Sequence, residues 1–258
     1  MLLLLKLTLV PALVAGVTLG ARRWGPRVGG WLTALPLVAG PALLFLAVEQ
    51  GRAFAGAAAL STLVSLIAVA AFGVAYGWVA VRHAWPASLA AGWGAFVVVT
   101  MLLQALRWTP LAAIVAVFTA FAVAGRALPA ARGRSAALES RGWDVPLRML
   151  GALAVVLTVT HIADRLGPRW SGAFTPFPVA LAVVLVFAHA QQGAPLALRL
   201  LHGFFPAMWG FGLFVFVVAV TIVPLGVPLA FLLALLAQAG VHALVLWRMM
   251  RGQTAAAA

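Results

Sequence analysis

Apolar runs of about 20 residues follow one another along almost the whole chain. Each run is long enough to cross the hydrocarbon core of a bilayer as an α-helix. Only 8% of the 258 residues are charged and 65% are hydrophobic, whereas a soluble domain carries roughly 25% charged residues. A transmembrane β-barrel is excluded, because its strands are short and alternate apolar with polar residues. The sequence therefore predicts an all-α polytopic membrane protein.

Nine such runs predict nine transmembrane helices. Their predicted ranges are 2–21, 30–49, 53–81, 86–106, 109–128, 147–164, 172–190, 195–223 and 228–248. Short turns that contain proline or glycine separate them, except for one polar, arginine-rich linker before the sixth run. The N-terminal run lacks a basic segment before it and a clear cleavage site after it, so we expect it to persist as a spanning helix.

The first part of the chain recurs in the second part without a gap. Residues 5–106 align with residues 147–248 at a constant shift of 142 positions. Apolar helices align by chance at many positions, but they rarely keep glycine, proline, arginine and glutamine in register. The matches of these types include Gly25/Gly167, Pro26/Pro168, Gly30/Gly172, Pro36/Pro178, Gln50/Gln192 and Gly51/Gly193. We therefore divide the chain into repeat one (5–106), a connector helix with the linker (107–146), repeat two (147–248) and a tail (249–258).

Lysine and arginine residues sit singly at the ends of the predicted helices. The chain carries 17 of them against 4 acidic residues, for a net charge of +13. Because they form no basic stripe, we expect contacts with anionic lipid headgroups and no nucleic-acid partner. Their distribution places the N-terminus outside and the C-terminus in the cytoplasm by the positive-inside rule. Five crossings separate equivalent positions, so the two repeats are predicted to be inverted; one helix more or fewer would make them parallel.

Proline and glycine interrupt the second and seventh predicted helices at corresponding positions. An interior proline removes a backbone hydrogen bond, and in hydrocarbon the freed carbonyl must find a partner within the protein. Such interruptions in two related halves point to a transporter's binding site, although kinks that merely fit the packing are the alternative. The predicted substrate-binding residues are Thr33, Pro36, Gly40, Gln50, Thr175, Pro178 and Gln192.

Few ionisable residues lie within or beside the predicted helices. Glu49 and His189 are candidate coupling residues, because an ionisable group in a membrane is functional by default. Glu49 is equally suited to pair with Arg52, and a neutral histidine to bond a nearby carbonyl. Two arginine pairs precede the interrupted helices and either form an electrostatic vestibule for an anionic group or anchor the helices beside headgroups. These are Arg23, Arg27, Arg165 and Arg169.

Signatures of catalysis and of cofactor binding are missing from the sequence. The chain has no cysteine, so thiolate metal sites and cysteine nucleophiles are excluded. A phosphate-binding loop, a zinc-protease motif and a dinucleotide-binding fingerprint are also lacking. We expect no cofactor, no metal and no enzymatic activity.

The segment Gly172-Ala-Phe-Thr-Pro-Phe-Pro178 is similar to one found in the GlpM-like family of small four-helix membrane proteins, with the first proline displaced by one position. The chain also resembles bacterial multi-pass inner-membrane proteins whose halves repeat. The resemblance implies two four-helix units fused through a connector, location in a bacterial inner membrane and a link to envelope polysaccharide production. It assigns no functional residue.

Together these features predict a secondary transporter or lipid-type flippase that moves a small neutral, amphipathic or anionic solute. Inverted repeats would rock about a site between the interrupted helices and expose it alternately to the two sides. The alternative is a non-transporting membrane scaffold or accessory subunit of an envelope-biogenesis complex. Membrane lipids and an unknown small solute are the expected partners, and a homodimer is left open.

Overall fold

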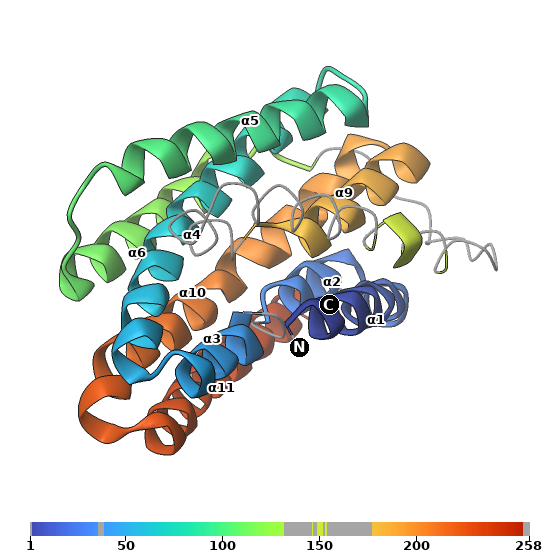
Figure 1. Ribbon diagram of the computed structural model, residues 1–258. Coiled ribbons are helices and arrows are strands. Elements are labelled where there is room, and N and C mark those ends of the chain that lie inside the picture. Colours follow the sequence, from blue (N-terminus) through green and yellow to red (C-terminus); the bar gives the residue numbers. More distant parts are fainter. Residues whose placement is uncertain are drawn as a thin grey trace.

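The computed structural model describes residues 2–35, 39–131 and 177–254, with a few isolated positions between 146 and 153. Within these ranges every regular element is an α-helix (Figure 1). The helices are α1 (Leu2–Trp24), α2 (Pro26–Thr33), α3 (Ala39–Glu49), α4 (Arg52–Ala80), α5 (Trp85–Gln104), α6 (Pro110–Ala127), α9 (Val179–Gln192), α10 (Ala194–Leu225) and α11 (Val227–Thr254). Proline stands in the first turn of several of them, where a missing N–H costs no hydrogen bond.

Five of these helices are long and apolar enough to cross a membrane, namely α4, α5, α6, α10 and α11. This agrees with a multi-pass membrane protein. Helices α3 and α9 are also apolar but shorter, with 11 and 14 residues. The described part of the chain therefore shows five candidate spanning helices and not the nine predicted. The predicted helix 147–164 lies almost wholly outside the described residues.

The structure divides the predicted helix 30–49 into two helices, in agreement with the interruption predicted from its proline. Helix α2 ends at Thr33 and α3 begins at Ala39, so α2 is about 12 Å long and α3 about 17 Å, each too short to cross. Leu35 is the last described residue before the gap, and its N–H bonds the Leu32 carbonyl in a tight turn. The residue before a proline is disfavoured in the α conformation, and Pro36 follows Leu35 in the sequence.

The predicted helix 172–190 also begins later than expected. Phe177 and Pro178 are not helical, and α9 starts at Val179. The N–H of Ala182 bonds the Pro178 carbonyl at 2.8 Å, so the proline caps the helix rather than interrupting it. Pro178 therefore stands directly before the start of α9, whereas Pro36 lies outside the described residues.

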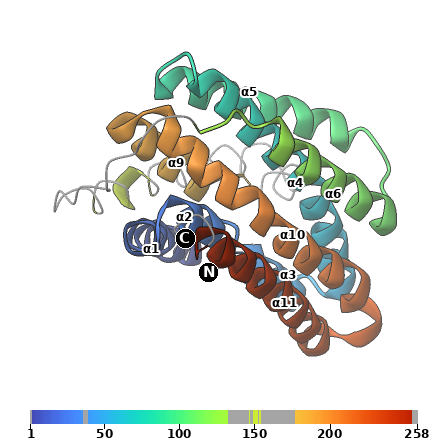
Figure 2. The same ribbon diagram turned by 180° about the vertical axis from the view of Figure 1, so that it is seen from behind.

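Helix α10 lies at the centre of the helical bundle and contacts α2, α4, α6, α9 and α11. Figures 1 and 2 show it between α4–α6 on one side and α1–α3 with α11 on the other. Gly56 of α4 faces Ile222 of α10, whereas Gly77 faces Leu198, so α4 and α10 run antiparallel. Large aromatic side chains fill the core around this crossing: Phe72, Tyr76, Phe96, Phe121, Phe205 and Phe214.

Two pairs of described helices begin 142 residues apart. Helix α4 starts at Arg52 and α10 at Ala194, and both follow a glycine with positive φ. Helix α5 starts at Trp85 and α11 at Val227. Each pair of starts is separated by the shift of 142 found in the sequence. The hairpins α4–α5 and α10–α11 thus begin at residues with the same spacing.

Helices α2 and α10 approach so closely that their backbones touch. A Cβ atom on Gly30 would overlap the Leu200 carbonyl, and one on Gly203 would overlap the Arg27 carbonyl. Only glycine permits such a crossing. It holds the first half of α2 against the N-terminal part of α10.

Candidate functional site

The end of α2 carries a side chain into the interior of the bundle. The half-buried Trp31 ring stands edge-on to the imidazole of His242 in α11, with 5.3 Å between ring centroids. Gln238 lies one helical turn before His242, and the side chains of these two residues are only 5% and 4% exposed. Gly210 of α10 makes room for the imidazole, since a Cβ there would overlap Nδ1. Helices α2, α10 and α11 therefore enclose a polar cluster, which we define as Trp31, Gln238 and His242.

Three buried polar atoms of this cluster have no hydrogen-bond partner among the described residues. They are Trp31 Nε1, Gln238 Oε1 and His242 Nε2. Both α11 residues lie well within the candidate span Val227–Arg248. A buried polar group without a partner costs about 1–3 kcal/mol, and ionisable side chains inside a membrane are rare and mark substrate or ion pathways. The polar cluster is therefore the strongest candidate site in the described part of the chain.

The hydrogen bond of His242 decides what the cluster offers to a ligand. Nδ1 lies 3.3 Å from the Gln238 carbonyl oxygen. A carbonyl only accepts, so Nδ1 donates, and in the neutral ring Nε2 is then an acceptor. Gln238 Oε1 is a second acceptor, while Trp31 Nε1 is a donor. This set suits a ligand that donates two hydrogen bonds and accepts one, such as a primary amide or an amine.

The corresponding positions in the first half are apolar or nearly so. Phe96 and Thr100 precede Gln238 and His242 by the repeat shift of 142. Phe177 packs edge-on against Phe96 at 5.0 Å and against Trp93 at 5.8 Å. The segment before Pro178 therefore meets an aromatic wall. Thr100 Oγ1 and Trp93 Nε1 are nonetheless buried without a partner among the described residues, as are the polar atoms of the cluster.

A second buried polar contact joins α4 and α9. The Tyr76 hydroxyl lies 3.3 Å from His189 Nδ1, and the two rings are edge-on at 6.0 Å. His189 is the candidate coupling residue, and the structure gives it a tyrosine partner where a backbone carbonyl was the expected alternative. Tyr76 is fully buried, so the pair links two helices inside the bundle.

Replacing Tyr76 by phenylalanine removes the hydroxyl that bonds His189 and keeps the ring. We expect the free energy of unfolding to fall by about 1 kcal/mol, the usual net contribution of one buried hydrogen bond. Thermal unfolding in detergent measures the change. Ser65→Ala on the same helix is the matched control, because Ser65 Oγ is buried and has no partner in the described ranges. A loss of stability in Ser65→Ala as large as in Tyr76→Phe would contradict the assignment.

The predicted substrate residues of the first half do not converge on one point. The Thr33 hydroxyl donates to the Gly30 carbonyl and so closes the end of α2. Gly40 is buried against the ring of Phe214. Gln50 and Glu49 are exposed at the far end of α3. Thr33 is on the same helix as Trp31 of the polar cluster.

In the second half Pro178 is buried and Gln192 is half-buried at the end of α9. Of the predicted vestibule, Arg23 and Arg27 are exposed at the end of α1 and the start of α2. The remaining predicted site residues lie outside the described residues: Pro36, Thr175, Arg165 and Arg169.

The site residues predicted from the sequence include none of the three members of the polar cluster. The signal that was available is a glutamine and a histidine four positions apart inside an apolar run, which puts both on one helix face. Within the described residues no three metal-ligating side chains gather.

No family model matches the chain, and no curated protein or solved structure is significantly similar to it. These comparisons identify no family, so the resemblance to GlpM-like proteins carries no further argument.

Proposed function

We propose that the chain is a secondary transporter or lipid-type flippase with inverted repeats, whose solute binds at the polar cluster. The observation that carries the proposal is the set of unpartnered polar atoms at Trp31, Gln238 and His242, beside the point where α2 ends. Helix ends within a bilayer occur where the backbone is buried in protein or lines a cavity. Discontinuous helices at the midplane are the usual location of transporter sites.

The antiparallel course of α4 and α10 supports inversion of the repeats. Their starts lie 142 residues apart, yet the start of each helix lies beside the end of the other. Alternating access would then be a rocking of the α10–α11 hairpin against α4–α5, with α2 moving beside the site. The free acceptors favour a small neutral or amphipathic solute that donates hydrogen bonds, over an anionic one.

Cysteines at positions 49 and 191 test the inversion. Both residues are exposed and they differ by the repeat shift. The natural chain has no cysteine, so Glu49→Cys and Gln191→Cys each carry a single thiol. We expect a membrane-impermeant maleimide to label position 49 in intact cells and position 191 only after permeabilisation. Labelling of both from the same side would show that the repeats are parallel.

Solute binding is tested by a thermal-shift screen of the purified chain. The probes are small alcohols, amides, amines and sugars, compared with carboxylates and phosphates of similar size. We expect at least one uncharged or amine class to raise the melting temperature in proportion to the logarithm of its concentration. An unchanged melting temperature with every probe would contradict the transporter proposal.

The second candidate function is a non-transporting scaffold or accessory subunit of an envelope-biogenesis complex. It is favoured by the packing of Phe177 on Trp93 and Phe96, which leaves an apolar contact beside Pro178. A scaffold would show no thermal shift with any solute and would co-purify with a protein partner.

A further inference from the structure

An open groove lies at the end of the bundle where α4 ends and α10 begins. Its volume is about 420 Å³, within the range of small-molecule sites. The third wall is the segment that follows α6. The lining side chains are apolar apart from one indole, and they include Trp78, Val81, Pro129, Ala130, Pro195 and Leu198. We call this feature the Trp78 groove.

Two hydrogen bonds hold its walls together. Trp78 Nε1 donates to the Ala127 carbonyl at 2.8 Å, which ties the indole of α4 to the end of α6. His202 Nε2 lies 3.2 Å from the Pro129 carbonyl, which ties the following segment to α10. The groove is thus shaped by three separate elements before any ligand binds. Even so, Trp78 remains 57% exposed and Val81 52% exposed.

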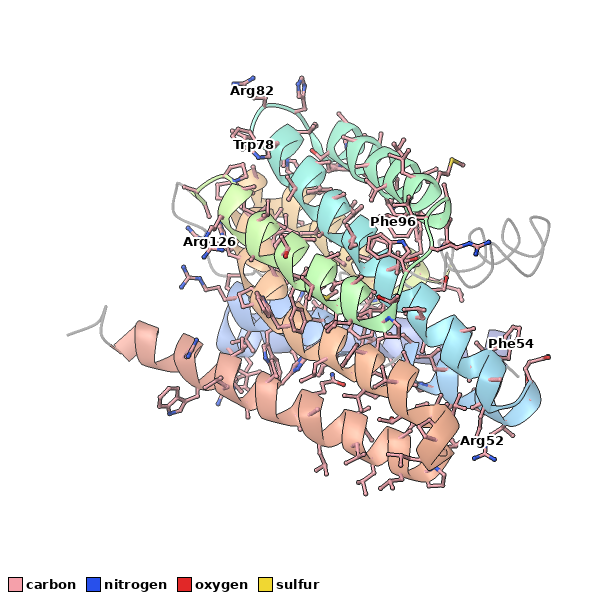
Figure 3. The ribbon with its side chains drawn as sticks, turned by 90° about the vertical axis from the view of Figure 1, so that its left-hand side faces the viewer. Arg52, Phe54, Trp78, Arg82, Phe96 and Arg126 are labelled. Atoms are coloured by element: carbon pink, nitrogen blue, oxygen red, sulfur yellow. The ribbon has the colours of Figure 1, made fainter. Side chains whose placement is uncertain are left out.

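Two exposed arginines lie close in sequence to the lining residues of the groove, and we call them its basic rim. Arg82 follows Trp78 by one helical turn, and Arg126 directly precedes the residue that accepts the Trp78 bond; both are exposed. Figure 3 shows Trp78, Arg82 and Arg126 at the same end of the molecule, with Arg52 at the opposite end. Arg126 donates one N–H to the Ala122 carbonyl, and a guanidinium has five such donors.

Acidic side chains are remote from this rim in the part of the chain that the structure describes. The one acid there is Glu49, which adjoins the start of α4. Since α4 rises 1.5 Å per residue, that end lies about 40 Å from Trp78. Helix α4 is longer than a bilayer core is thick, so its tryptophan- and arginine-bearing end reaches the interface, where both side chains are favoured.

We propose that the Trp78 groove binds an anionic phospholipid. An acyl chain lies against Val81, Pro195 and Leu198, and the phosphate lies at the end of the groove that carries Arg82 and Arg126. Apolar walls with a cationic rim complement both parts of such a lipid, whereas a free phosphate would use the rim alone. The site is independent of the polar cluster and of the transport proposal.

The test compares two lipids with identical dioleoyl chains, phosphatidylglycerol and phosphatidylcholine, added to the delipidated full chain in detergent. We expect phosphatidylglycerol to raise the melting temperature by several degrees more. The double variant Arg82→Gln/Arg126→Gln should lose most of this difference. Arg52→Gln/Arg107→Gln is the matched control, because it removes the same charge from exposed arginines at the opposite end. Ala130→Trp, which adds bulk at an exposed wall position, should abolish the difference while the arginines remain.

Equal shifts with the two lipids would overturn the proposal, as would an equal loss in the control pair. The proposal would also be overturned if Ala130→Trp kept the full preference for phosphatidylglycerol over phosphatidylcholine. That result is expected if residues of the chain itself fill the groove. Inorganic phosphate that reproduces the phosphatidylglycerol shift would reduce the site to a simple anion site. If the arginine double variant does not fold, native mass spectrometry replaces it. The measurement compares the phosphatidylglycerol retained by the natural chain with that retained by Ala130→Trp, and equal retention would overturn the proposal.

Discussion

Alanine at Gly30 or at Gly203 should prevent α2 from packing on α10. In each case the added Cβ overlaps a backbone carbonyl, that of Leu200 or of Arg27. A backbone cannot move aside as a flexible side chain can, so the helices must separate. Overpacking a core typically costs about 1–3 kcal/mol, and we expect about 3 kcal/mol or more here. Thermal unfolding of the purified variants in detergent, together with their yield in the membrane, measures the loss.

The two glycines lie at one crossing, and this gives the prediction an internal check. The double variant Gly30→Ala/Gly203→Ala should be little worse than either single variant, because the first added methyl group already separates the helices. Gly94→Ala is the matched control, since nothing lies within 4 Å of a Cβ there. In that variant stability should hold or rise by up to about 1 kcal/mol, because alanine favours the helix. Near-natural melting temperatures for both single variants would show that α2 does not touch α10 this closely.

Leucine at Gln238 should stabilise the protein and abolish solute binding. The Oε1 atom is buried without a partner in the described residues, so its removal relieves a cost of about 1–2 kcal/mol. The backbone carbonyl of Gln238 stays in place and keeps its bond to His242. Phenylalanine occupies the corresponding position 96 and is fully buried, which indicates that this site in the bundle accepts an apolar side chain. Melting temperature and the solute-induced shift are measured on the same preparation.

Gln104→Leu is the contrasting variant. Gln104 donates to the Ser61 hydroxyl at 3.3 Å, so its loss leaves a polar partner behind and should destabilise by about 1 kcal/mol. A variant that gains stability but loses the solute-induced rise in melting temperature is typical of a binding site, where function is retained at a cost in stability. If Gln238→Leu binds solute as the natural chain does, the site lies elsewhere. If it loses stability as Gln104→Leu does, the cluster is structural.

Much of the candidate site could not be predicted, because its parts are distant in sequence. Trp31 and His242 meet across more than 200 positions, and Tyr76 meets His189 across 113. The repeat predicted symmetric polar pairs such as Gln50 and Gln192, yet Gln50 is exposed and Gln192 is at a helix end. What breaks the symmetry is the pair of side chains at positions 96 and 238. Phe96 stands where the second half has Gln238, so the first half lacks the amide of the polar cluster at that position.

Local chemistry was enough to predict that this chain is helical, apolar and long enough to cross a membrane several times. The proline at position 36 likewise predicted a discontinuity, because a proline acts on its immediate neighbours. Which helices meet is another matter, since an all-round apolar helix has no preferred face in its own sequence. The tertiary structure decided it through the glycines of α2 and α10, where backbones touch, and these contacts bring Trp31 to His242.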